Sequence, residues 1–245
     1  MTKVGAPEKL IIGTKRLDGR SLEDMRPMET DVGIIKKATG SAIFKFGNTY
    51  ALAAVYGPKP FHPRFLQDPQ KAVLKCRYNM APFSTGDRIR PGYNRRSTEI
   101  SKVIRLALDS VVFVEDYPRT GIEIFAEIIQ ANASTRCAGL NAASLALADA
   151  GVPMRELVCS CSVGKVEDTI IMDLDGPEDM FGQVDLAVAT IGNQDKFVLV
   201  QMDGVVTKDE FMKMIELSKK GCGSVYKKQK EILREKYKTG ELNDE

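Results

Sequence analysis

Small, polar and cationic residues stand directly before an alanine-rich segment at residues 130–151, which reads QANASTRCAGLNAASLALADAG. The alanines and leucines predict a helix, and the Gly-Val-Pro that follows predicts its end. A helix start has unpaired backbone N–H groups and a partial positive charge, so it attracts anions. Two hydroxyls and a guanidinium at that start, from Ser134, Thr135 and Arg136, would suit phosphate. The alternative is a core helix capped by Ser134 or Thr135, with Arg136 on the surface.

A second cationic segment lies upstream, where residues 88–105 read RIRPGYNRRSTEISKVIR and carry six basic residues against Glu99 alone. Apolar residues recur there with the spacing of a helix that has one buried face, and Asn94 is the expected start of that helix. Arg95 and Arg96 therefore stand at a helix mouth. Such a run is usually a solvated face, but on a chain of net charge +2 a focused basic patch also suits a polyanion.

Two carboxylates in the sequence DGPEDMFGQVDLAV are candidates for acid–base chemistry. Asp179 falls in an expected loop at residues 175–183, and Asp185 falls just inside the next strand. One of them could protonate a leaving oxygen, or both could hold a divalent cation. The alternative is a solvated acidic turn, and spacing alone leaves both interpretations open.

The histidine count excludes several mechanisms, since His62 is the only histidine in the chain. We therefore expect neither a Ser–His–Asp triad nor a multi-histidine metal site. Acid–base chemistry would then depend on carboxylates, lysine, tyrosine or a metal-bound water.

Composition indicates a soluble globular protein, with 43% hydrophobic and 28% charged residues. The sequence has no apolar run long enough for a membrane span, and its first residues lack the apolar core of a signal peptide. The five cysteines are irregularly spaced, which favours a reducing compartment. Cys159 and Cys161 fall on one face of an expected strand, where core packing is the simplest role. We expect a cytoplasmic protein with no membrane partner.

Hydrophobic patterning predicts an α+β fold of two units, 1–152 and 153–245, each with several strands followed by helices and with mixed sheets. Residues 57–70 are rich in proline and are expected to form an irregular exposed loop. A capping box at Thr207 and Glu210 predicts the start of a long C-terminal helix. The expected strands are 28–35, 40–46, 49–57, 71–83, 120–131, 156–166, 168–174, 184–191 and 196–202.

A series of short motifs resembles the RNase PH family, and more narrowly the catalytic RNase PH-type subunits of the archaeal exosome. Each motif is weak alone, but their order and spacing are specific, and the resemblance extends over residues 9–237. The motifs are RLDGR at 16–20, RRSTEISKVIR at 95–105, NASTR at 132–136, AASLALADAGVPM at 142–154, EDMFGQVD at 178–185 and MDG at 202–204.

The resemblance implies a fold, the RNase PH fold, with two βαβ-containing halves whose mixed sheets pack around helices. It also implies an activity: phosphate-dependent 3′-to-5′ degradation of RNA that releases nucleoside diphosphates and can reverse to RNA tailing. In the family, the first half carries the RNA and phosphate contacts, and the second half carries the catalytic aspartates and a C-terminal helix. By position in the motifs, the expected residues are Arg96, Ser134, Thr135 and Arg136 for phosphate, Arg64, Arg95 and His62 for RNA, and Asp179 and Asp185 for catalysis and for a Mg²⁺ or Mn²⁺ ion.

The partners that the resemblance implies are single-stranded RNA, a noncatalytic RNase PH-type ring subunit and RNA-binding cap proteins. The ring would contain six subunits arranged as a trimer of heterodimers. Three alternatives stay open: a noncatalytic ring subunit, a homohexameric RNase PH that trims transfer RNA precursors, and a small-molecule kinase. The aspartate pair and the Thr-Arg pair count against the first, and the segments EKLIIGTKRLDGR and HPRFLQDP favour the exosome over the second. No glycine-rich phosphate loop supports the third.

Overall fold

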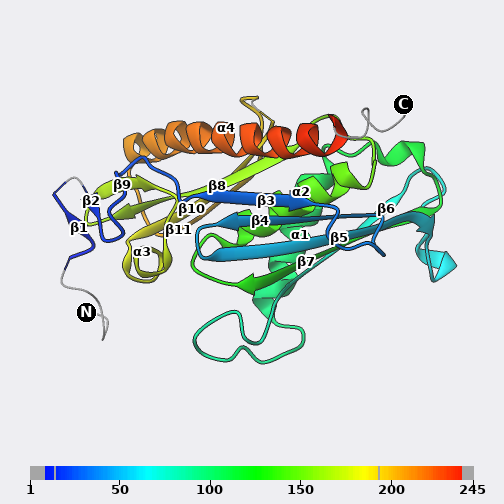
Figure 1. Cartoon of the computed structure of the whole chain (residues 1–245), viewed down its shortest axis with the longest axis horizontal. Coiled ribbons are helices and arrows are strands. Elements are labelled where there is room, and N and C mark those ends of the chain that lie inside the picture. Colours follow the sequence, from blue (N-terminus) through cyan, green and yellow to red (C-terminus); the bar gives the residue numbers. More distant parts are fainter. Residues whose placement is uncertain (1–8, 14, 193, 239–245) are drawn as a thin grey trace.

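The computed structural model describes residues 9–13, 15–192 and 194–238, and within these ranges it contains two large β-sheets, a two-stranded sheet of β1 and β2, and two helices, α2 and α4, that contact both large sheets (Figure 1). The first sheet is formed by β3 (Met28–Val32), β4 (Gly40–Phe46), β5 (Thr49–Pro60), β6 (Val73–Met80) and β7 (Thr120–Gln130). The second sheet is formed by β8 (Val158–Val166), β9 (Thr169–Met172), β10 (Val184–Ile191) and β11 (Phe197–Asp203). The helices are α1 (Arg95–Asp109), α2 (Thr135–Asp149), α3 (Gly176–Phe181) and α4 (Lys208–Lys238). Smaller elements are β1 (Ile11–Ile12), β2 (Lys15–Arg16) and the 3₁₀ turns η1 (Arg64–Leu66) and η2 (Val114–Asp116).

The first sheet is mixed, whereas the second is antiparallel throughout. Strand order in the first sheet is β3-β4-β5-β7-β6, and β6 runs parallel to β7 after a crossover through α1. This crossover is a βαβ unit, which a parallel pair requires. Strand order in the second sheet is β11-β10-β8-β9. The predicted α+β class is confirmed.

Helix α2 is buried on all sides because it packs against both sheets. Every residue from Cys137 to Leu147 is buried, and most of them are alanine, glycine, serine or leucine. Small side chains allow close approach: a Cβ on Gly139 would lie 3.2 Å from the Tyr78 ring. A helix without a polar face can only be stable in such a core. Truncating Leu145 to alanine there would cost about 2–5 kcal/mol.

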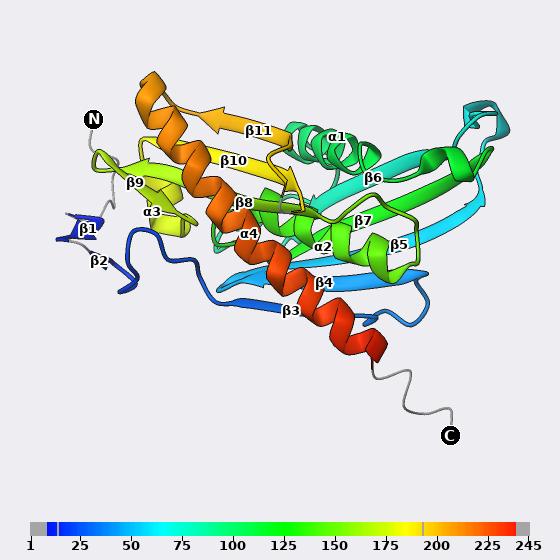
Figure 2. The same ribbon diagram turned by 90° about the horizontal axis from the view of Figure 1, so that it is seen from above.

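Helix α4 lies across the second sheet and reaches β3 of the first (Figure 2). Cys159 and Cys161 on β8 are buried beneath it, as their spacing predicts. Cys161 lies against Cys222 of α4, with their sulfurs 3.9 Å apart. All five cysteines are free thiols. Among the described residues, no helix is both long and apolar enough to cross a membrane.

Local signals for helix starts are confirmed, and two expected loops contain structure instead. Asn94 accepts a hydrogen bond from Ser97 N at 2.7 Å, and Thr207 exchanges hydrogen bonds with Glu210. The expectation of an irregular loop at 57–70 is wrong for its first residues, since β5 continues to Pro60, and for residues 64–66, which form η1. The expected loop at 175–183 contains α3. Both segments contain proline near their start, and proline is accepted on an edge strand or in a first helical turn.

The predicted boundary at residues 152 and 153 falls between α2 and β8. One hydrophobic cluster contains residues from both sides of that position, such as Leu145 and Val158. The two halves therefore share a core, and the division into units stays a prediction.

Candidate active site

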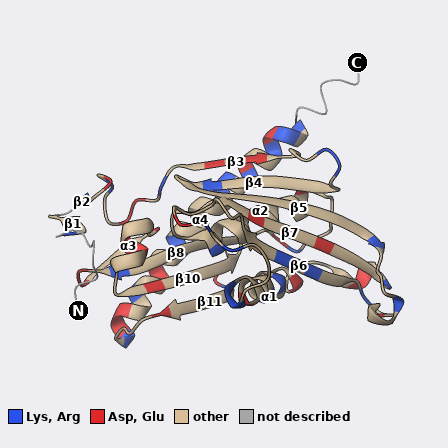
Figure 3. Cartoon of the chain, turned by 90° about the horizontal axis from the view of Figure 1, so that it is seen from below, with Lys and Arg blue, Asp and Glu red and all other residues tan. Residues whose placement is uncertain are grey.

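A cleft of about 1430 Å³ lies where the two halves meet, and six of the predicted site residues line it. They are Arg96, Ser134, Thr135, Arg136, Asp179 and Asp185. Figure 3 shows, from below, the basic start of α1 and the acidic segments of α3 and β10 that border this region. Residues more than 80 positions apart along the chain, such as Arg96 and Asp185, are thus brought to one cavity.

One side of the cleft is cationic, and we call Arg96, Arg136 and the first turn of α2 the cationic wall. Arg96 is exposed in the first turn of α1. Arg136 is 17% exposed and lies 3.7 Å from Glu99, a distance at which the ion pair is loose. Its Nε and the hydroxyl of Thr135 are buried and have no hydrogen-bond partner within the described part of the chain. Buried polar groups are nearly always hydrogen-bonded, so an oxyanion at the start of α2 would satisfy them.

Another part of the lining is acidic, and we call Asp179, Asp185 and Asp203 the anionic wall. Asp185 on β10 is directly opposite Asp203 on β11. Burial raises the pKa of Asp185 to about 6, the charge of Asp179 adds to that rise, and Arg136 and Arg96 oppose it. Like charges placed opposite each other destabilise a sheet, so this arrangement serves something other than stability. A carboxyl group with a pKa near neutral can both hold and release a proton.

A buried ion pair fixes the helix that carries Asp179. Asp175 caps α3 by accepting from Glu178 N at 3.2 Å, and Glu178 accepts from Asp175 N at 2.9 Å. Glu178 is 1% exposed and forms an ion pair with Arg16 of β2. Arg16 also donates to the carbonyl oxygen of Met172 at 2.6 Å. Because Glu178 is held by both Asp175 and Arg16, its neighbour Asp179 is placed on a rigid turn.

A second buried pair joins the start of α2 to the second sheet. Arg26 donates to Asp173 from its backbone N at 2.8 Å, from Nε at 2.9 Å and from Nη2 at 2.7 Å. It also donates to the Ser134 hydroxyl at 3.0 Å. Asn132, next to this site, accepts from Gly176 N at 3.1 Å and so links the α2 start to the α3 start. The two walls of the cleft are therefore positioned by one connected network.

Ser134 differs from the capping residue that the sequence suggests. It occupies the N-cap position of α2 with a left-handed backbone, φ 52°, and its side chain makes no cap hydrogen bond. Its hydroxyl instead lies 2.7 Å from the Ser162 hydroxyl and 3.2 Å from the Leu174 carbonyl oxygen. Any contact of Ser134 with phosphate would thus come from its backbone N–H.

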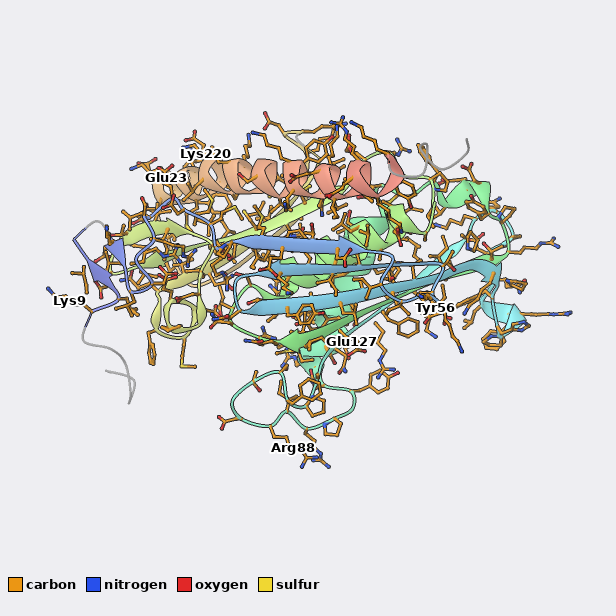
Figure 4. All side chains as sticks on the ribbon, in the orientation of Figure 1. Lys9, Glu23, Tyr56, Arg88, Glu127 and Lys220 are labelled. Atoms are coloured by element: carbon orange, nitrogen blue, oxygen red, sulfur yellow. The ribbon has the colours of Figure 1, made fainter. Side chains whose placement is uncertain are left out.

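The structure adds positioning residues that sequence reasoning missed, namely Arg16, Arg26, Asp173 and Glu178. Two signals were present: Arg16 opens the RLDGR motif, and Asp175 with Glu178 has the spacing of a capping box. The loop before α1 is a further addition, because Thr85, Asp87 and Arg88 line the cleft. Figure 4 shows the Arg88 side chain at the tip of that loop.

The predicted RNA-contacting residues lie outside the cleft lining. Arg64 and His62 are exposed, in and beside η1, which Figure 1 shows at the opposite end of the molecule from α3. Arg95 is exposed at the first position of α1, adjacent to Arg96. Their roles stay predictions.

Comparison with known proteins fits this geometry. The model for domain 1 of the 3′ exoribonuclease family (RNase PH) matches residues 24–153, and the model for domain 2 matches residues 156–221. The chain belongs to this family.

Curated relatives are similar over almost the full chain. The exosome complex component Rrp41 of Thermococcus onnurineus is 50% identical over 237 residues, which cover 96% of this chain and 95% of that protein. The protein of the same name from Pyrococcus furiosus is 52% identical over 223 residues, covering 91% and 89%. Among solved structures, rice Rrp46 matches with a TM-score of 0.78 at 23% identity, covering 88% of this chain and 98% of that one. This last similarity shows the fold.

Proposed function

We propose that this chain is the catalytic RNase PH-type subunit of an archaeal exosome. Its activity would be phosphorolytic degradation of RNA from the 3′ end, with release of nucleoside diphosphates. The observation that carries the proposal is the single cleft that is lined by both the cationic wall and the anionic wall. The relatives with 50% and 52% sequence identity are named exosome complex component Rrp41, which supports the assignment to an exosome.

Phosphorolysis requires that two anions, inorganic phosphate and an RNA phosphodiester, meet against their mutual repulsion. Arg96, Arg136 and the N–H groups of α2 would hold the attacking phosphate. Fixed guanidinium groups and backbone N–H groups do this without reorganising during the reaction. The unsatisfied Arg136 Nε and Thr135 hydroxyl supply further hydrogen-bonding capacity at the same place.

The reaction exchanges one bond to phosphorus for another. An oxygen of the phosphate forms a bond to the last phosphodiester phosphorus, while the bond from that phosphorus to the 3′ oxygen of the preceding nucleotide breaks. The leaving oxygen takes a proton, and the products are a nucleoside diphosphate and an RNA with a new 3′ hydroxyl. Asp179 and Asp185 would supply that proton, because the pKa of Asp185 lies at about 6. Since the two bonds are of similar energy, accumulated nucleoside diphosphate would drive the reverse reaction, RNA tailing.

A divalent cation, Mg²⁺ or Mn²⁺, fits the anionic wall only if substrate phosphates complete its ligands. No cluster of three or more potential metal ligands occurs within the described ranges. Mg²⁺, however, is commonly bound by one or two carboxylates together with substrate phosphates. Asp179 and Asp185 would hold the ion in this manner as deprotonated carboxylates, a role that is an alternative to supplying the proton, and the ion would stabilise negative charge on the phosphoryl oxygens.

The remaining assignments follow from the family and the charges. Arg64, His62 and Arg95 would contact the RNA backbone before it reaches the cleft. The first half would thus bind RNA and phosphate, and the second half would supply the aspartates. A noncatalytic RNase PH-type subunit would complete a six-membered ring, as a trimer of heterodimers, with RNA-binding cap proteins on it. We place this assembly in the cytoplasm.

The deciding experiment is incubation of the chain, assembled with a candidate ring partner, with end-labelled RNA in the presence and absence of phosphate. We expect nucleoside diphosphates in chromatography, and only when phosphate is added. Release of nucleoside monophosphates without phosphate would contradict the proposal, because it would mean hydrolysis. Asp179→Asn, prepared identically, controls for contaminating nucleases. The mass of the mixture with and without the partner separates a mixed ring from a homohexamer.

A further inference from the structure

A second cavity, of about 320 Å³, lies against the free edge of β6 and has no role in the chemistry above. Its walls come from β6, β7, the residues before α1 and the first turns of α1. Its volume falls in the range of small-ligand pockets. The chemically distinctive lining residues are Lys75, Arg77, Asn79, Tyr93, Glu123 and Phe125.

Aromatic rings form one part of this pocket. Tyr93 is 88% exposed, and the Arg77 guanidinium lies 5.9 Å from the centre of its ring. Phe125 is held edge-to-face against Tyr56, with ring centres 5.9 Å apart. An exposed tyrosine ring with an arginine beside it is the surface on which nucleobases stack in single-strand binding proteins.

Cations form the other part. Lys75 and Arg77 point from the same face of β6, since they are two residues apart on one strand. Glu123 opposes them, but it is bonded to Lys59 at 2.6 Å and to Lys75 at 3.5 Å. The hydrogen bond from Lys59 lowers the pKa of Glu123.

A second carboxylate beside the pocket, that of Glu127, is also hydrogen-bonded. Glu127 accepts a hydrogen bond from Asn79 at 2.7 Å. Three cations, Lys59, Lys75 and Arg77, therefore face two carboxylates, Glu123 and Glu127. The surplus favours a phosphate group.

The pocket and the catalytic cleft share two elements. On β6, Asn79 lines the pocket and the next residue, Met80, lines the cleft. On α1, Arg96 lines the cleft and Ser97 lines the pocket. Arg95 is exposed at this same helix start. A strand whose 3′ end occupies the cleft can therefore reach the pocket by crossing the start of α1.

We propose that this pocket is a second RNA subsite, which holds a nucleotide on the 5′ side of those in the cleft. The base would stack on Tyr93, and the phosphate would contact Lys75 and Arg77. That the strand is RNA rests on the function proposed above. Contiguity with the cleft favours an internal nucleotide of the substrate over a free nucleotide.

The test measures affinity for oligoadenylates of increasing length, using the assembled ring with Asp179→Asn present so that the RNA survives. Adding Tyr93→Leu should leave the shortest RNAs unaffected and weaken longer ones roughly 5- to 100-fold, which is the range for loss of one stacked base. Tyr93→Phe should bind like the parent, because it keeps the ring. Arg77→Gln should weaken the same long RNAs. Tyr50→Leu is the matched control, since Tyr50 also stands beside a cation, 5.1 Å from Lys45, but outside the pocket.

Equal affinity of Tyr93→Leu and its parent at every length would overturn the subsite. Adenosine monophosphate is a second probe: binding that Tyr93→Leu abolishes, with RNA affinity unchanged, would mean a free-nucleotide site and also overturn the proposal. Phosphate-dependent degradation by the unmodified chain is measured in parallel. If that activity persists, only the subsite fails; if the unmodified ring neither binds nor degrades RNA, the proposed function fails and the subsite fails with it.

Discussion

The molecule contains two sets of arginines and carboxylates that differ in how completely they are paired. In the buried set, Arg26 makes several hydrogen bonds to Asp173, and both side chains are at most 5% exposed. In the cleft, Arg136 has a loose ion pair with Glu99 at 3.7 Å, and burial raises the pKa of Asp185 to about 6. The same residue types therefore serve structure where their hydrogen bonds are satisfied, and suit chemistry where capacity is left over.

The largest effect on activity should come from the carboxylates of the cleft. Asp185→Asn preserves shape and removes the titratable group, so RNA and phosphate should still bind while turnover falls. A general acid–base group typically contributes ~100- to 10,000-fold, and the single-turnover rate should fall by that order. Extra Mg²⁺ or Mn²⁺ should restore part of the rate if Asp179 and Asp185 share an ion. If this variant degrades RNA at the same rate as the unmodified chain, the anionic wall is only a solvated surface.

Breaking the buried set should cost stability instead. Arg26→Met leaves the buried Asp173 with only the longer 3.4 Å ion pair to Arg20, and loss of one partner of a buried pair costs up to about 3–5 kcal/mol. The free energy of unfolding, from urea titration, measures this directly. Lys45→Met is the matched control, because its pair with Glu29 is exposed to solvent and should contribute little to stability. Equal losses in the two variants would show that pairing in the buried network is unimportant.

The buried carboxylate of Asp185 in the cleft should also lower the free energy of unfolding. The pKa of Asp185 rises from 3.8 to about 6 on folding, so the folded chain binds more protons than the unfolded chain in that window. The stability contributed by the protonated carboxyl is therefore present below pH 4, is lost as pH rises to about 6, and stays lost above.

Asp185→Asn should accordingly be more stable than the parent at pH 8, by up to about 3 kcal/mol, and similar to it near pH 4. Thermal unfolding at the two pH values, without phosphate or divalent cations, gives the comparison. Asp168→Asn is the control, since the hydrogen bond from Lys165 lowers the pKa of Asp168 and the substitution should bring no gain. A destabilised Asp185→Asn at pH 8 would refute the electrostatic interpretation.

The smallest effect concerns the distant cation in η1. Arg64→Ala should weaken binding of long RNA irrespective of sequence, and should reduce the salt dependence by about one phosphate contact, a change of ~0.7 in the logarithmic slope. Arg234→Ala, an exposed arginine on α4, should leave the slope unchanged. If Arg64→Ala also leaves it unchanged, the loop around η1 has a structural role only.

Prediction from sequence succeeded where the signal is local. Asn94 and Thr207 precede their helices with short-range capping partners, and Cys159 and Cys161 alternate within one strand. Strand limits at 40–46 and 184–191 match the structure for the same reason. Local chemistry decides such features within a few residues.

The residues that hold the cleft together could not be derived in this way. Arg16 and Glu178 are 162 positions apart, and no periodicity connects them. Ser134 was one of two residues suggested as the cap of α2, but tertiary contacts with Ser162 and Arg26 hold its hydroxyl elsewhere. The short helix α3 lies in a segment expected to be a loop, although the capping box at Asp175 and Glu178 is a local signal for its start.

The measurement that tests the account most directly is the phosphate dependence of the single-turnover rate in two variants of an otherwise intact ring. Arg136→Ala should raise the phosphate concentration that gives half the maximal rate, because it removes part of the cationic wall. Asp179→Asn should lower the maximal rate ~100- to 10,000-fold and leave that concentration nearly unchanged, because it acts on the leaving group. If instead Asp179→Asn shifts the phosphate dependence and Arg136→Ala does not, the two walls do not divide phosphate binding and proton transfer between them.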